Sequence, residues 1–222
     1  MKVEAFVFDL DGTLLNTLED LTDSANYALA YCGFPTHGPD EIRSYIGNGI
    51  VKLMERACPA NTEPNDIEKA LAAFRRHYRE NCVSCTKAYP NVADTLAALG
   101  EMGFKIGVLS NKSHYETVRL VEHFFGSIVE YAQGSMEEFP KKPRPEGLFH
   151  VLSCLGVRRE NAVYVGDSGV DVETAANAGI SCIGVAWGFR GREALTAAGA
   201  DTIINDPMEL LDIAGSYEPL RY

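Results

Sequence analysis

The sequence has little of three features that mark common classes of protein. It contains no apolar run close to the ~20 residues that a membrane-spanning helix needs. Six cysteines in 222 residues are too sparse for a disulfide-stabilised scaffold. Positive charge is also scarce, because 20 basic residues against 31 acidic ones give a formal net charge of −11. A general nucleic-acid binder needs a basic face and an anionic membrane repels an acidic surface, so we expect neither as a partner.

The N-terminal segment lacks the pattern of a secretory signal. The apolar run after Lys2 is broken by Glu4 and reaches Asp9 within a few residues. We therefore expect a cytoplasmic protein with reduced thiols. Cys82 and Cys85 form a lone Cys-x-x-Cys, whereas a structural zinc site needs two further ligands, so the role of this pair stays open.

Short runs rich in β-branched and aromatic residues recur along the chain and predict strands buried on both faces. These runs lie at 3–9, 105–110, 128–133, 162–165, 182–186 and 202–204. Apolar residues at helical spacing lie between them, for example Val92, Leu96 and Leu99. Strands that alternate with helices predict an α/β fold, a three-layer Rossmann-like core with a parallel sheet.

One long segment breaks this alternation, because no strand is evident between about residues 16 and 86. Apolar residues repeat at helical spacing over 18–32 and again over 67–78, and prolines punctuate the segment. We therefore expect a small all-helical cap domain at 16–86, inserted into a catalytic core formed by 1–15 and 87–222.

Polar side chains follow three of the predicted strands at the edge where open parallel sheets bind ligands. They are Asp9, Asp11 and Thr13, then Ser110 and Asn111, then Asp167 and Asp171. Four carboxylates at one edge repel one another unless a cation neutralises them. Oxygen ligands without a nearby histidine favour Mg²⁺ over zinc, so we expect magnesium as the cofactor.

The chemistry of these residues suits phosphoryl transfer. Asp9 ends a strand and is held rigidly, which suits a nucleophile, and Asp11 two residues later suits a general acid/base. Thr13 and Ser110 offer hydroxyl groups to phosphate oxygens. The basic segment 141–145 supplies candidate cations for a phosphoryl group, and a solvated basic loop explains it equally well.

The order of these motifs resembles that of the haloacid dehalogenase-like phosphatases. The motifs are Asp-Leu-Asp-Gly-Thr at 9–13, Ser-Asn at 110–111, Lys-Pro-x-Pro at 142–145 and Gly-Asp-Ser-x-x-Asp at 166–171. The resemblance covers nearly the whole chain, including a helical insertion after the first motif. It implies an aspartyl-phosphate on Asp9, with Asp11 as acid/base and Lys142 as the cation that steadies the nucleophile.

The resemblance also implies how phosphate and metal are bound. The phosphate would contact the Ser110 hydroxyl and the Asn111 backbone. The implied Mg²⁺ ligands are the carboxylates of Asp9 and Asp167 and the carbonyl of Asp11, with Asp171 in support.

Four further segments, 16–21, 45–49, 89–92 and 187–190, resemble phosphoglycolate phosphatases. They imply hydrolysis of 2-phosphoglycolate to glycolate and phosphate. Gly47, Asn48 and Gly49 are candidates for a substrate-specificity loop, and Arg43 is a candidate contact for a substrate carboxylate. An ordinary turn between helices and a solvated arginine are the alternatives.

Several other activities remain open. Related insertions serve pyrophosphate, nucleotide and sugar-phosphate hydrolysis. A β-phosphoglucomutase-like mutase shares the carboxylates, whereas a catalytically silent binding protein is disfavoured because no motif residue is missing. We expect a small phosphorylated metabolite as partner, no nucleic acid and no membrane, and a monomer or homodimer.

Overall fold

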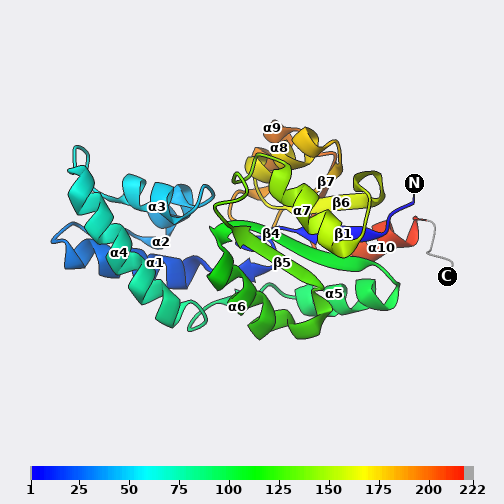
Figure 1. Cartoon of the computed structure of the whole chain (residues 1–222), viewed down its shortest axis with the longest axis horizontal. Coiled ribbons are helices and arrows are strands. Elements are labelled where there is room, and N and C mark those ends of the chain that lie inside the picture. The colour runs from blue at the N-terminus through cyan, green and yellow to red at the C-terminus, as the bar shows by residue number, and fades with distance from the viewer. Residues whose placement is uncertain (1, 218–222) are drawn as a thin grey trace. The chain divides into compact units, whose positions relative to one another are not determined.

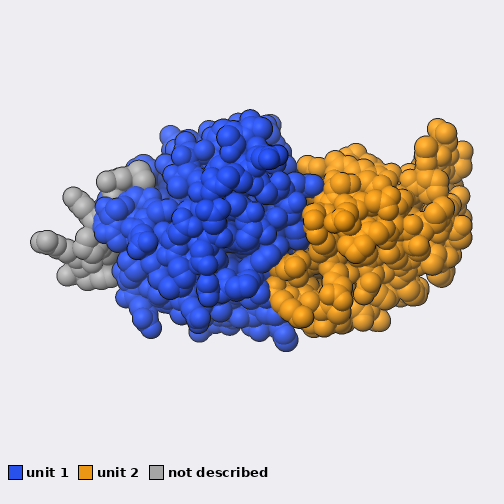
Figure 2. All heavy atoms as spheres, turned by 180° about the vertical axis from the view of Figure 1, so that it is seen from behind, with its two compact units in different colours: residues 1–15, 88–222 blue, residues 16–87 orange. Residues whose placement is uncertain are grey.

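The computed structural model describes residues 2–217 and divides the chain into two compact units. One unit comprises Met1–Leu15 with Ala88–Tyr222, and the other comprises Asn16–Lys87 (Figure 2). The inserted unit therefore ends one residue later than the cap domain expected from the sequence. None of the helices within residues 2–217 has the length and apolarity to cross a membrane.

A six-stranded sheet forms the centre of the first unit, in the order β5-β4-β1-β6-β7-β8 (Figure 1). Every neighbouring pair is parallel. The strands are β1 (Ala5–Phe8), β4 (Lys105–Ser113), β5 (Tyr131–Ser135), β6 (Ala162–Gly166), β7 (Ser181–Val185) and β8 (Thr202–Ile204). The central strand β1 reads Ala-Phe-Val-Phe and is buried along its whole length. Apolar side chains on both faces of a strand are typical of a sheet covered on both sides, and the predicted parallel α/β fold is confirmed.

Helices cover both faces of this sheet and complete the three layers (Figure 1). One face carries α5 (Val92–Glu101), α6 (His114–Phe125) and α10 (Glu209–Gly215), and the other carries α7 (Glu146–Leu155), α8 (Gly169–Ala178) and α9 (Gly191–Ala198). Val7 and Tyr164 are partners across β1 and β6. Both pack with Val151 of α7 and Ala175 of α8 in one apolar cluster. Burial of this cluster fixes the register of the central strands.

The second unit is helical, with α1 (Leu18–Tyr31), α2 (Pro39–Tyr45), α3 (Ile50–Ala57) and α4 (Pro64–Asn81). The long helices α1 and α4 pack along each other. Asp20 of α1 accepts hydrogen bonds from the backbone N–H groups of Cys85 and Thr86. Where the chain leaves and re-enters the first unit, β2 (Leu15–Asn16) and β3 (Lys87–Ala88) form a two-stranded sheet. The sequence did not predict these strands, because two residues are too few to show an alternating pattern.

Candidate functional site

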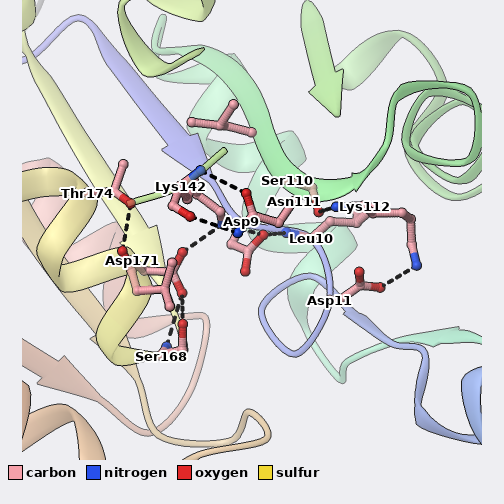
Figure 3. A network of polar contacts seen from close by, with 12 residues as sticks. Asp9, Leu10, Asp11, Ser110, Asn111, Lys112, Lys142, Ser168, Asp171 and Thr174 are labelled. Carbon is pink, nitrogen blue, oxygen red and sulfur yellow. Dashed lines mark hydrogen bonds and ion pairs between the residues drawn. The ribbon is translucent and has the colours of Figure 1, made fainter. Parts of the chain in front are cut away.

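Asp9 lies immediately after β1 at the carboxyl edge of the sheet (Figure 3). Its backbone N–H donates to the carbonyl of Val165 at 2.9 Å, so the pairing with β6 continues one residue past the strand. Its own Oδ1 accepts the N–H of Leu10 at 2.7 Å. The residue is 8 % exposed. Neighbouring strands thus hold this carboxylate in one place.

The Ser-Asn-Lys segment 110–112 lies in a bulge of β4. Leu109 pairs with Gln133, and Ser113 pairs with Ser135. Three residues of β4 therefore lie between these two pairs, whereas β5 has one residue between them. The three residues of the bulge are buried. A bulge re-aims side chains, which explains how consecutive residues of one strand all contribute to this edge of the sheet.

The Asn111 carboxamide fixes the backbone of Lys142. Its Nδ2 donates to the carbonyl of Lys142 at 3.1 Å, and its Oδ1 accepts the N–H of Lys142 at 2.8 Å. From the sequence, the resemblance implies a role only for the backbone of Asn111, as a phosphate contact. The structure adds that the side chain joins the Ser-Asn motif to the Lys-Pro motif.

The Lys142 ammonium lies at the centre of the polar network. Its Nζ is 2.8 Å from Asp9 Oδ1, 2.8 Å from Asp171 Oδ1 and 3.1 Å from the hydroxyl of Tyr164. Burial alone would lower the pKa of Lys142, but the Asp171 and Asp9 carboxylates outweigh burial and hold that pKa well above its ordinary value. Lys142 is therefore a permanent cation at this position.

The other basic residues of the same segment are solvent-exposed. Lys141 and Arg144 are both exposed, and Arg144 forms an ion pair with Glu146. The solvated-loop interpretation thus fits these two residues, whereas it does not fit Lys142.

Three buried carboxylates lie beside Lys142. Asp9, Asp167 and Asp171 each offer an oxygen within 4.8 Å of the others. Burial raises the pKa of Asp9 to about 7, although Lys142 opposes the shift. Burial, then the Asp171 charge, raises the pKa of Asp167 well above its ordinary value. Three carboxylates against one ammonium leave a shortage of positive charge, and an all-oxygen donor set of this kind suits Mg²⁺.

Asp167 is held by backbone that approaches it closely. Its Oδ2 accepts the N–H of Phe189 at 2.7 Å. A Cβ added to Gly12, which has a φ of +89°, would lie 2.4 Å from the same oxygen. A Cβ added to Gly188 would lie 2.2 Å from Asp167 Cβ. The space around Asp167 therefore requires glycine at both positions.

Asp171 has structural partners for both of its carboxylate oxygens. Oδ1 contacts Lys142, and Oδ2 accepts the N–H of Ser168 at 3.1 Å and its hydroxyl at 2.6 Å. The second pair is part of a capping box at the start of α8. Asp171 thus anchors Lys142 to a helix N-terminus, and its expected support of a metal stays a prediction.

The Asp11 side chain points to a different partner. Its Oδ1 lies 3.1 Å from Nζ of Lys112, whose side chain is 3 % exposed (Figure 3). Within residues 2–217 the close carboxylate cluster comprises the other three aspartates. The role that the family resemblance gives to the Asp11 carbonyl does not involve this side chain, and it stays a prediction.

Thr13 is also buried at the end of the first motif, and its carbonyl accepts the indole N–H of Trp187 at 3.0 Å. Its Oγ1 has no hydrogen-bond partner among residues 2–217. The residue lines a small cavity with Phe8 and Leu96. The expected contact between this hydroxyl and phosphate stays a prediction.

The candidate specificity loop belongs to the second unit, between α2 and α3. Gly47 and Gly49 have φ values of +123° and +84°, which favour glycine. Arg56 donates to Asn48 Oδ1 at 2.9 Å and to the carbonyl of Tyr45 at 2.8 Å. Arg56, which is not among the predicted site residues, thus stabilises the loop.

The candidate carboxylate contact of the second unit has a local partner. Arg43 of α2 lies 3.3 Å from Asp40, and its side chain is exposed. Its predicted role, like that of the Gly-Asn-Gly loop, stays a prediction.

Sequence reasoning missed three parts of the site: Lys112, Tyr164 and the backbone of Phe189. Lys112 directly follows the Ser-Asn motif, and a tyrosine inside a fully buried strand needs a partner for its hydroxyl, so each carried a weak signal. The Phe189 amide carried none, because no side chain is involved.

Known proteins similar to this chain belong to one family. Residues 6–185 match the model of the haloacid dehalogenase-like hydrolases. A phosphoglycolate phosphatase of Chromobacterium violaceum is 33 % identical over 220 residues, which cover 95 % of this chain and 96 % of the relative. A phosphoglycolate phosphatase of Pseudomonas syringae pv. tomato is 32 % identical over 211 residues, 92 % of this chain and 77 % of the relative.

Solved structures agree with these relatives. A "predicted phosphoglycolate phosphatase" from Haemophilus somnus superposes with a TM-score of 0.90 at 27 % identity, covering 96 % of this chain and 99 % of that one. CbbY from Rhodobacter sphaeroides, solved in complex with phosphate, has a TM-score of 0.75 at 28 % identity over 94 % of this chain and 96 % of its own. The chain belongs to the haloacid dehalogenase-like hydrolases, and among them it resembles the phosphoglycolate phosphatases.

Proposed function

We propose that the protein is a magnesium-dependent phosphatase that hydrolyses 2-phosphoglycolate to glycolate and phosphate through an aspartyl-phosphate. Its class, the phosphoric monoester hydrolases, follows from its family and relatives. The substrate, the metal and the roles of single residues are the proposal. The observation that carries it is the buried Asp9 carboxylate, held 2.8 Å from Lys142 within a cluster of carboxylates.

In the first step, a carboxylate oxygen of Asp9 attacks the phosphorus while the bond to the ester oxygen breaks. Asp11 donates a proton to the departing glycolate oxygen. In the second step, Asp11 takes a proton from water, the water oxygen attacks the phosphorus, and the bond to Asp9 breaks. Phosphate is released and both carboxyl groups return to their starting states.

Positioning and charge neutralisation supply most of the catalysis in phosphoryl transfer. Lys142 offsets negative charge on the nucleophile, and Ser110 and the Asn111 backbone are the proposed contacts of the phosphate oxygens. Asp9 and Asp167 are the proposed side-chain ligands of Mg²⁺. When bound, Mg²⁺ would offset charge on the transferred phosphoryl group.

The proposed substrate is argued from the relatives and from the second unit. Phosphoglycolate phosphatases of Chromobacterium violaceum and Pseudomonas syringae pv. tomato are among its relatives. The positive φ values of Gly47 and Gly49 support the proposed role of the loop at 47–49 in contacting a small substrate. Pyrophosphate, nucleotides and sugar phosphates are the alternative substrates. A cytoplasmic location and a monomeric or dimeric state are parts of the same proposal.

A phosphate-release screen tests the proposal. Purified protein would be assayed with and without Mg²⁺ on 2-phosphoglycolate, pyrophosphate, nucleoside monophosphates and sugar phosphates, with Asp9→Asn as the blank. We expect Mg²⁺-dependent release that is fastest, by kcat/KM, for 2-phosphoglycolate. Faster release from another ester would contradict the substrate, and activity of the blank would contradict the nucleophile.

A further inference from the structure

Tyr164 places a phenolic hydroxyl inside the polar network, although no motif of the family resemblance includes it. The residue lies in β6, two positions before Gly166, and is 0 % exposed. Its ring packs with Val7, Leu109 and Val151 in the apolar cluster under α7. Packing on all sides leaves the hydroxyl one position, at the carboxyl edge of the sheet.

The hydroxyl completes the set of acceptors around Lys142. A lysine ammonium has three N–H donors, and three acceptor atoms surround this one: Asp9 Oδ1, Asp171 Oδ1 and the hydroxyl oxygen of Tyr164. A buried ammonium with an unused donor would pay a large desolvation cost. Of the three acceptors, the tyrosine is the neutral one, so it orients the ammonium without adding to the excess of negative charge.

The proton of Tyr164 points away from Lys142. Since the ammonium donates to the hydroxyl oxygen, the hydroxyl must donate elsewhere, and Leu109 O at 3.3 Å and Asp171 Oδ1 at 3.4 Å are in reach. Leu109 is the last regularly paired residue of β4 before the bulge. A tyrosine phenol is neutral near pH 7, so the hydroxyl acts by its position.

We propose that Tyr164 is a positioning residue, which holds the Lys142 ammonium at the point from which it contacts Asp9. Asp9 and Asp171 by themselves cannot define that point, because two contacts leave the ammonium free to rotate about the line that joins the two carboxylates. The hydroxyl supplies the third contact, from a ring that is fixed in the core. The kinetic part of this inference rests on the proposed phosphatase function.

The first test is Tyr164→Phe, which removes the hydroxyl and keeps the ring in the core. We expect kcat for phosphate release to fall about tenfold or more, as for loss of one hydrogen bond to a charged group, with KM within about twofold. The matched control is Tyr131→Phe. This variant also removes a tyrosine hydroxyl, one that lies in β5 and forms a hydrogen bond with Cys154. It should keep the kinetics of the wild-type chain. An unchanged kcat for Tyr164→Phe would overturn the proposal.

The second test needs no substrate. Tyr164→Phe should lower the melting temperature of the wild-type chain by about 2–4 °C or more, because a buried charged donor loses its acceptor. In a Lys142→Met background that donor is absent, so the same change should cost much less. Equal losses in both backgrounds would mean that the hydroxyl does not act through Lys142, and would overturn the proposal.

The two tests separate this inference from the proposed function. If the wild-type chain releases phosphate from no ester, the proposed function fails, and the melting cycle alone decides the role of Tyr164. If the wild-type chain is active, a fall in kcat together with coupled melting shifts supports the proposal, and either result without the other overturns it.

Discussion

Nζ of Lys112 lies 3.1 Å from Oδ1 of Asp11, and the side chain that carries it is 3 % exposed. A buried ammonium beside the proposed acid/base fixes the direction of that carboxylate. It also offsets the charge that Asp11 bears after it has given up its proton. Two consecutive residues of the β4 bulge thus hold two different side chains. Asn111 holds Lys142, and Lys112 holds Asp11.

Lys112→Met should slow the release of poor leaving groups more than that of good ones. We expect kcat on 2-phosphoglycolate to fall about tenfold or more, because the acid that protonates the leaving alkoxide is misplaced. An activated aryl phosphate needs little protonation and should lose much less. Lys69→Met, which removes an exposed lysine paired with Asp66, is the control. Equal losses on both substrates would contradict this role for Lys112.

Stabilisation by Mg²⁺ should grow with pH. The pKa of Asp9 is raised to about 7 from 3.8, so between these values the folded protein binds more protons than the unfolded chain. The free energy of unfolding of the metal-free protein therefore falls, through this group, as pH rises across that window. Because Mg²⁺ binds ionised carboxylates, it should raise the melting temperature little at about pH 5.5 and strongly at about pH 8.

Thermal melts with and without Mg²⁺ at several pH values would measure this effect. Asp167→Asn should remove most of the Mg²⁺-dependent shift. Glu160→Gln, at an exposed carboxylate that pairs with Arg158 before the start of β6, should leave it intact. A shift of the same size at every pH would argue that these buried carboxylates do not bind the metal.

Asn111→Ala should reduce both stability and turnover. The change removes both hydrogen bonds to the Lys142 backbone and leaves a buried N–H and carbonyl without partners, at a cost of about 1–3 kcal/mol per group. Asn26 makes the same pair of bonds to the backbone of His37, at 2.9 Å each, in the second unit. Asn26→Ala should therefore lower the melting temperature and leave kcat unchanged. If both variants lose activity in proportion to their loss of stability, the prediction that Asn111 supports turnover by holding Lys142 is contradicted.

Gly188→Ala should weaken the use of Mg²⁺. The new Cβ would lie 2.2 Å from Asp167 Cβ and 2.4 Å from the carbonyl of Gly12, so the carboxylate must shift. We expect the Mg²⁺ concentration for half-maximal activity to rise about tenfold or more. Gly100 of α5 has open space around it, so Gly100→Ala should leave the Mg²⁺ titration unchanged. An unaltered titration for Gly188→Ala would show that Asp167 tolerates displacement.

Much of the fold could be predicted because its central strands β1 and β6 are buried on both faces and its helices are amphipathic. The extension of β4 beyond residue 110 could not be predicted, since Ser-Asn-Lys has no strand-like pattern and the bulge depends on pairing with β5. The candidate carboxylates could be found from their position after strands. Their partners could not, because Lys112, Tyr164 and Phe189 reach the site through contacts between distant segments.

The backbone pairing of β1 has a consequence for how the chain is made. Ala5 pairs with Lys105 on one side and Ala162 on the other, and residues 16–87 come between. During synthesis, the Ala-Phe-Val-Phe strand therefore emerges long before either neighbour exists. An unpaired apolar strand of this kind is prone to wrong association, and pairings so remote in sequence form slowly. Asp9 acquires its surroundings only when β6 arrives, so the chain cannot assemble its polar network until most of it has left the ribosome.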